Sequence, residues 1–182
     1  MTAFTILVAI SENGVISKDN KIPWDNPADQ KRMYEYIKDK AIICGYKTAL
    51  QLRYSRNNKS YGYPLLTGFP MCYYPDSDRE ILQDFPYPVA SLAEAKRLFR
   101  YARLTDPEMG KLKDEICILG GQQLYQEAVG SPLVNKIIVT IMSGTYEGDR
   151  FFPKLDLKIW EETNLMLEKD ATIRIYQRKH SK

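Results

Sequence analysis

Short apolar runs that alternate with helical stretches constrain this sequence most. Residues 4–10, FTILVAI, are apolar almost throughout, which is typical of a strand covered on both faces. Further β-prone runs follow with helical segments or turns between them, at 41–44, 71–74, 87–90, 115–119 and 135–142. Such interleaving predicts an α/β fold: a single domain over residues 1–182 with a central, mostly parallel mixed β-sheet flanked by helices.

The connecting segments carry their own signals. A helix is expected from Pro27, which suits a first helical position, with Asn26 as its cap. Other helices are expected over 46–53, 92–102 and 122–129, and a long surface loop over the Tyr-, Gly- and Pro-rich residues 54–70. Residues 158–168 and 171–179 alternate as in a C-terminal antiparallel hairpin.

Composition excludes several classes of protein. Net charge is +3, from 26 Lys and Arg against 23 Asp and Glu, which is too small and too dispersed for a nucleic-acid binder. No apolar run approaches the length that crosses a bilayer, so no membrane partner is expected. We expect a monomer that acts on a small molecule.

The cysteines and the single histidine argue against a metal site. Cys44, Cys72 and Cys117 each lie in an apolar segment, which favours buried free thiols and a reducing, cytoplasmic compartment. The N-terminal residues lack the basic region and cleavage site of a signal peptide. No CxxC pair exists and His180 lies in the tail, so no metal is expected.

Two glycine turns follow predicted strands. Gly120 and Gly121 end one strand and open a helix, and Gly45 does the same ahead of Lys47 and Thr48. Glycines let a backbone approach a ligand closely, and helix N-termini favour phosphate. Each turn alone is explained as well by tight geometry, because neither a G-x-G-x-x-G motif nor a P-loop is present. Together they suit a ligand with two phosphates.

Asp29 raises a sharper question. On a helix that starts near Pro27 it shares a face with Met33, Tyr36 and Ile37, so a carboxylate tops an apolar stripe. The plain alternative is an acidic first-turn residue stabilised by the helix dipole. If Asp29 instead faces an apolar pocket, its use is chemical, because burying an unpaired charge is expensive.

Four segments, taken together, resemble the dihydrofolate reductase family in order and spacing. They are IPWDNPAD at 22–29, IICGYKT at 42–48, ILGGQQLY at 118–125 and YEGDRFFP at 146–153. The resemblance runs from Ile6 to Pro153, with the predicted hairpin behind it. It implies reduction of 7,8-dihydrofolate to 5,6,7,8-tetrahydrofolate by hydride transfer from NADPH, with NADH as the alternative donor.

The resemblance assigns roles at the substrate end. Asp29 matches the acid that holds the pteridine ring and assists protonation at N5. Thr140 matches the threonine that hydrogen-bonds that acid, and Trp24 the tryptophan that closes the cleft; these three residues are the catalytic candidates. The substrate-binding candidates are Leu7, Val8, Asp29, Gln30, Met33, Leu119, Tyr125 and Thr140.

At the cofactor end the resemblance implies a cis peptide between Gly120 and Gly121. It also implies a mobile lid over residues 11–23 that excludes water during transfer. The cofactor-binding candidates are Ala9, Ile16, Ile22, Gly45, Tyr46, Lys47, Thr48, Leu119, Gly120, Gly121, Gln122, Gln123 and Leu124.

Some positions depart from the family pattern. Phe69 aligns with the arginine that clamps the glutamate tail of folate, and a ring cannot replace that bond; Arg53, Arg56 and Lys59 are the candidate substitutes. Ser17 replaces a lid glycine. Tyr46 and Asp76 stand where residues that serve the 2′-phosphate of NADPH are expected.

Three functions are therefore open. The first is a dihydrofolate reductase that binds the folate tail differently. The second is a reductase of the same fold for another pterin or bicyclic substrate without a glutamate tail. The third, a binding protein without catalysis, is disfavoured because Asp29, Trp24, Thr140 and both glycine turns are all present.

Overall fold

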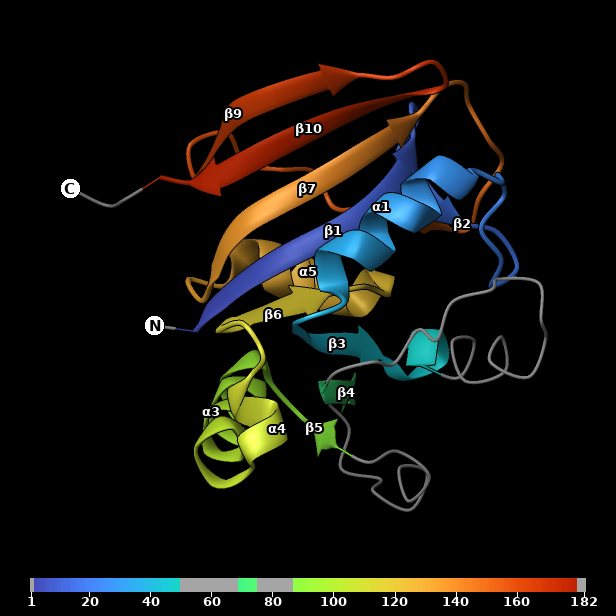
Figure 1. The fold of residues 1–182 in the computed structure, drawn as a ribbon. Helices are drawn as coiled ribbons and strands as arrows, with labels where there is room; N and C mark the ends of the chain where they lie inside the picture. Colours follow the sequence, from blue (N-terminus) through green and yellow to red (C-terminus); the bar gives the residue numbers. More distant parts are fainter. Residues whose placement is uncertain (1, 50–68, 75–86, 180–182) are drawn as a thin grey trace.

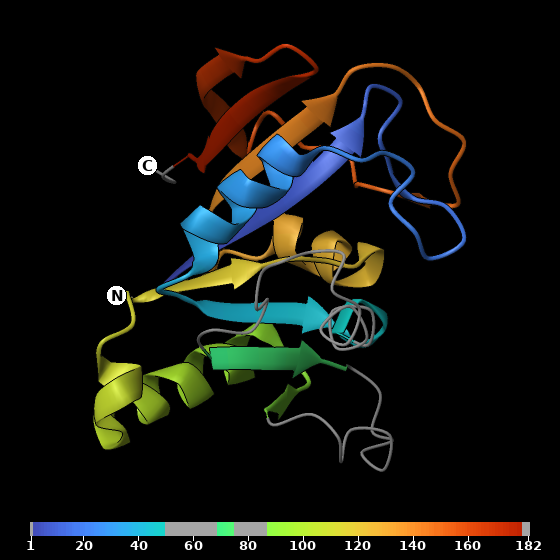
Figure 2. The ribbon, with the colours of Figure 1, turned by 45° about the vertical axis from the view of Figure 1, so that its right-hand side comes forward.

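A computed structural model describes residues 2–49, 69–74 and 87–179. Its core is a mixed sheet of eight strands in the order β5-β4-β3-β6-β1-β7-β10-β9 (Figures 1 and 2). Pairing is parallel from β5 to β7 and antiparallel from β7 through β10 to β9. The predicted fold class is thus confirmed, including the C-terminal hairpin.

The strands follow the apolar runs of the sequence closely. The central strand β1 extends from Ala3 to Ser11 and has buried side chains on both faces. The other strands are β2 Val15–Ser17, β3 Ala41–Gly45, β4 Phe69–Tyr73, β5 Pro88–Val89, β6 Glu115–Ile118, β7 Val134–Met142, β8 Arg150–Phe151, β9 Trp160–Leu167 and β10 Ala171–Arg178.

Helices cover the two faces of the sheet (Figure 1). Phe4, Ile6 and Val8 of β1 share a core with α3 and α5. Leu7 points to the other face, where it packs with Ile37 at the end of α1. The helices are α1 Pro27–Ile37, α3 Leu92–Thr105, α4 Pro107–Gly110 and α5 Gln122–Gly130, and Tyr46–Ala49 are also helical.

Helix α1 begins as its sequence predicts. Pro27 occupies its first turn, and the Asn26 side chain accepts a hydrogen bond from the backbone N–H of Asp29 at 3.0 Å. The cap fixes where the helix starts, and therefore which side chains of its first turns face the sheet. Helix α3 has the same kind of cap from Ser91.

The segment at Phe69 differs from expectation. Residues 69–70 were expected to end the surface loop over 54–70, and this placement is wrong; residues 54–68 of that loop lie outside the described residues. Phe69 is the first residue of β4, is 1% exposed, and stacks on Tyr87 with ring centroids 4.0 Å apart. The strand predicted at 71–74 therefore begins two residues earlier, with Pro70 inside it. Arg53, Arg56, Lys59, Asp76 and His180 lie outside the described residues.

The remaining elements add detail that the sequence did not predict. Strands β2 and β8 form a separate antiparallel pair, and α4 follows α3 directly. Cys44, Cys72 and Cys117 are buried free thiols, as expected. No helix in the described ranges is long and apolar enough to cross a membrane.

Candidate active site

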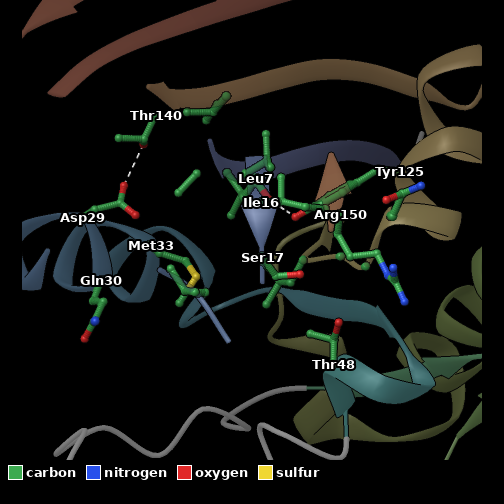
Figure 3. Close-up of a pocket in the computed structure, with 18 of the residues that line it drawn as sticks. Leu7, Ile16, Ser17, Asp29, Gln30, Met33, Thr48, Tyr125, Thr140 and Arg150 are labelled. Carbon is green, nitrogen blue, oxygen red and sulfur yellow. Dashed lines mark hydrogen bonds between the residues drawn. The ribbon is translucent and has the colours of Figure 1, made fainter. Parts of the chain in front are cut away.

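A cavity of about 460 Å³ opens at the carboxyl ends of the parallel strands, where open α/β sheets bind their ligands. Part of its lining is drawn in Figure 3. The lining comes from β1, the lid, α1, the turn after β3, the turn after β6, helix α5 and strands β7 to β10. The residues are Leu7, Val8, Ala9, Ile16, Ser17, Asn20, Lys21, Ile22, Asp29, Gln30, Arg32, Met33, Tyr36, Lys47, Thr48, Leu119, Gly120, Gly121, Gln122, Tyr125, Ile138, Thr140, Arg150, Met166, Ile173 and Ile175.

Asp29 and Thr140 meet across the cavity from α1 and β7 (Figure 3). The Thr140 hydroxyl donates to Oδ1 of Asp29 at 2.7 Å. Thr140 is buried, and the Asp29 side chain is only 20% exposed. The first-turn carboxylate therefore points into the cavity, as the apolar stripe on α1 suggested.

Burial is the main influence on the acidity of Asp29. Desolvation raises the pKa of this carboxyl above its usual range. The hydrogen bond from Thr140 and the positive charge of Arg32 lower the pKa, and the charge of Glu168 raises it. An acid with a raised pKa in an apolar cavity suits proton transfer near neutral pH.

Arg32 is a site residue that the sequence analysis missed. Its guanidinium lies 2.9 Å from Oδ1 of Asp29 and 2.5 Å from both carboxylate oxygens of Glu168. The i, i+3 spacing from Asp29 places both side chains on one side of α1. That spacing was the signal available in the sequence. Glu168 is far away in the chain, so the second contact could not be anticipated.

Tyr125 of α5 is a buried residue that lines the cavity. Its hydroxyl donates to the backbone carbonyl of Leu7 at 2.8 Å, and its ring packs edge-on against Phe152. Burial raises the pKa of Tyr125 well above its usual range, so the phenol stays protonated and keeps donating.

The two glycine turns touch each other. The N–H of Gly45 donates to the carbonyl of Gly120 at 2.5 Å, and the Gly120–Gly121 peptide is cis, as the resemblance implied. A Cβ built on Gly45 would lie 3.1 Å from the nitrogen of Gly121, closer than an ordinary contact. Small residues at this junction keep backbone groups accessible from the cavity.

Positive charge gathers at this end of the cavity. Helix α5 begins at Gln122 with no side-chain cap, so its first N–H groups are available to an anion. Arg150 and the hydroxyl of Thr48 lie at this end (Figure 3), and Lys47, the neighbour of Thr48 in the chain, also lines the cavity. Neutral backbone donors flanked by cations fit the phosphates of a dinucleotide. Arg150 was not among the predicted residues.

The YEGDRFFP segment is bound to the lid. Strand β8 pairs with β2, the N–H of Asp149 donates to Ser17, and the carboxylate of Asp149 accepts from the N–H of Asp19. Gly148 is required at this crossing, since a Cβ there would lie 2.2 Å from a methyl group of Val15. The segment thus ties the lid to the end of β7.

Some predicted site residues do not line the cavity. Trp24 instead packs edge-on against Tyr146, with ring centroids 5.3 Å apart. Leu124 is buried, and Gln123 is exposed. Gly45 does not line the cavity but donates a backbone hydrogen bond to Gly120, which does. Tyr46 packs against Tyr74. The other predicted residues all lie on the cavity wall. No cluster of metal-binding side chains occurs among the described residues.

Comparisons with known proteins agree with this geometry. A sequence model of dihydrofolate reductase matches residues 3–57 and 90–179. A dihydrofolate reductase of Staphylococcus haemolyticus is 30% identical over 162 residues, which span 88% of this chain and 82% of that protein. One of Haemophilus influenzae is 27% identical over 165 residues, or 87% of this chain and 83% of its own.

The fold has a solved counterpart. The structure of dihydrofolate reductase from Enterococcus faecalis, complexed with NADP(H) and RAB-propyl, superposes with a TM-score of 0.72 at 20% identity. The match covers 98% of both chains. Together with the family match over most of the sequence, this likeness extends from the first strand to the closing hairpin. The chain therefore belongs to the dihydrofolate reductase family and is an oxidoreductase of that type.

Proposed function

We propose that this enzyme reduces 7,8-dihydrofolate to 5,6,7,8-tetrahydrofolate with NADPH, and that Asp29 assists protonation of N5. One observation carries the proposal: a single carboxylate, held by Thr140, faces an apolar cavity whose other end is a cradle of glycine turns and cations. The first end suits the polar edge of a pteridine, and the second suits a dinucleotide.

Asp29 and its neighbours would hold the substrate. The carboxylate would accept hydrogen bonds from the 2-amino and N3 groups of the ring, with Thr140 completing the set. Apolar side chains on either side, such as Met33 and Ile16, would bury the ring faces (Figure 3). Burial excludes bulk water and strengthens each polar contact.

Proton transfer would depend on the raised pKa of Asp29. In the binding mode implied by the family resemblance, N5 is not adjacent to the carboxylate, so a water molecule would carry the proton. An acid whose pKa is raised keeps its proton to a higher pH than an ordinary aspartic acid and can supply that water. Thr140 would keep the carboxylate oriented throughout, because its hydroxyl donates to Oδ1.

The glycine turns would hold the dinucleotide phosphates through backbone N–H groups, with Lys47 and Arg150 as cations. The reduced nicotinamide would supply the hydride. Ala9 and Ile16 line the cavity between the turns and Asp29, where the two rings would have to meet. The lid, bound to β8, would exclude water from that meeting point.

The test is loss of reduced-nicotinamide absorbance with dihydrofolate, with NADPH and NADH run in parallel. Turnover that is lost in Asp29→Asn supports the proposal, and the preferred donor identifies the cofactor. A dihydropterin that lacks the glutamate tail serves as the second substrate. If only this substrate is reduced, the assignment of dihydrofolate is wrong; if neither is reduced by folded protein, so is the proposed reaction.

A further inference from the structure

Arg32 joins the acid of the site to a distant part of the chain. Its guanidinium contacts Oδ1 of Asp29 at 2.9 Å and both oxygens of Glu168 at 2.5 Å. The exposed fractions of these side chains are 28% for Arg32, 20% for Asp29 and 38% for Glu168. Arg32 and Asp29 are thus partly withdrawn from solvent, where their interaction is screened less than at the surface, whereas Glu168 is exposed and its charge is screened more.

Glu168 is itself held in place. It follows β9 in the turn to β10, and its N–H donates to the carbonyl of Ala171 at 2.9 Å. In the same hairpin Ile173 lies opposite Thr140 of β7. The hairpin that carries Glu168 is therefore in register with the strand that carries the other partner of Asp29.

We propose that Arg32 is a positioning residue, which orients the Asp29 carboxylate and biases its protonation equilibrium, and that Glu168 moderates this effect. The role rests on the proposed function of Asp29. A guanidinium has planar donors in a fixed arrangement. Its Nη2 contacts both oxygens of Glu168 and its Nη1 reaches Oδ1 of Asp29, so the two carboxylates together fix the plane of the guanidinium.

The two charges act in opposite directions. Arg32 favours the ionised form of Asp29, and Glu168 disfavours it. Other titratable groups also face the cavity: Tyr36 from α1, Tyr125 from α5, Lys21 from the lid, Lys47 after β3 and Arg150 from β8. Among the described residues, Arg32 is the one cation within ion-pair distance of Asp29.

The plain alternative is a structural tether between α1 and the hairpin. A tether would affect stability and leave the acidity of Asp29 alone. The first experiment therefore measures the acid directly, by a ¹³C NMR titration of the carboxyl carbons in the free enzyme. The Asp29 signal is identified by its absence in Asp29→Asn.

In Arg32→Gln we expect the Asp29 midpoint to rise by about one pH unit, the scale for losing one opposite charge in contact. Glu168→Gln should lower the Asp29 midpoint. Arg32→Lys keeps the positive charge, so the midpoint should rise less than in Arg32→Gln. Lys31→Gln is the matched control, because Lys31 lies on the same helix, is exposed and pairs with Glu35. A midpoint in Arg32→Gln that equals the control, or falls, would overturn the proposal.

The second experiment connects the acid to the reaction. The rate of hydride transfer with NADPH and dihydrofolate should fall as pH rises, with a midpoint that moves upward in Arg32→Gln and downward in Glu168→Gln. The NMR titration does not depend on turnover. Shifted NMR midpoints in a protein without reductase activity would refute the proposed function, while the control of the Asp29 protonation equilibrium by Arg32 would still hold. Unshifted midpoints in an active enzyme would refute the inference about Arg32 and leave the proposed function intact.

Discussion

The two ends of the cavity present different polar groups: a carboxylate side chain at the Asp29 end, and mainly backbone groups at the Gly120 end. Asp29 has Thr140 and Arg32 as partners in an otherwise largely apolar setting. At the other end, Gly45 and Gly120 are in backbone contact beside an uncapped helix, with Lys47 and Arg150 at the edge. A substitution should therefore act at one end by changing charge, and at the other by changing shape.

The largest effect is expected from Asp29→Asn. Loss of the acid should reduce hydride transfer at pH 7 by about 10²–10³-fold, within the range for general acid catalysis. The loss should shrink at low pH, because the substrate can then bind already protonated. NADPH affinity, measured by fluorescence titration, should stay within about twofold, since the carboxylate is remote from the glycine turns.

A loss of NADPH affinity in that variant would mean that the two ends are not independent. Unchanged hydride transfer at pH 7 would remove Asp29 from the mechanism altogether. Urea unfolding of the same protein sample shows whether the variant is folded, so a loss of NADPH affinity is not mistaken for misfolding.

The opposite test is Gly45→Ala. The added methyl group would meet backbone atoms of Gly121 at 3.1 Å and of Gly120 at 3.6 Å, and backbone cannot rotate away as a side chain can. We expect NADPH affinity to fall by about tenfold, the equivalent of roughly 1.4 kcal/mol. Gly130→Ala is the control, because nothing lies within 4 Å of a Cβ there. Equal NADPH affinities in the two variants would show that the close contact between Gly45 and the Gly120–Gly121 turn is not needed for binding.

The same contrast explains what the sequence could predict. Strands such as β1 and β6 are continuous apolar runs, and the Asn26–Pro27 start of α1 is a local signal. The glycine turns and Asp29 are visible as short-range features, but the pattern alone left their plain alternatives open, and the family resemblance assigned their roles. Strands β2 and β8 are only three and two residues long, so they show no periodicity.

Long-range contacts were beyond such reasoning. Arg32 and Glu168 are ordinary charged residues in the sequence, and only the fold brings them to 2.5 Å. Phe69 was misplaced for a related reason. The strand it begins contains Pro70, and its packing against Tyr87 and Phe99 is visible only in three dimensions.

A smaller effect is expected from Arg150→Gln. Arg150 lines the cofactor end of the cavity, but its side chain is 44% exposed, so solvent screens its charge. We expect NADPH to bind about three- to fivefold more weakly, with a weaker dependence on salt than in the unmodified enzyme. The comparison is Arg100→Gln, an exposed arginine on α3, which removes the same charge away from the cavity. Similar losses in both variants would indicate a general effect of net charge.

The smallest effect is on the free energy of unfolding, and it is expected only at the Asp29 end, where a buried group ionises. Burial raises the pKa of Asp29 above its ordinary value of 3.8. The folded protein therefore holds a proton more readily than the unfolded chain, and stability is lost as pH rises from that value through the raised pKa. Asparagine cannot ionise, so Asp29→Asn should be the more stable protein at pH 7, by about 0.5–1 kcal/mol.

The measurement is urea unfolding of both proteins at pH 7 and near pH 4. The advantage of Asp29→Asn should largely disappear at the lower pH, where burial no longer penalises a neutral carboxyl. Thr140 can still donate to the amide oxygen of asparagine, and Arg32 keeps Glu168, so the substitution mainly removes the buried charge. An advantage that is equal at both pH values would come from packing rather than ionisation. No advantage at pH 7 would mean that the contact with Arg32 fully offsets the desolvation of Asp29. Ionised Asp29 would then cost the folded protein no free energy of unfolding.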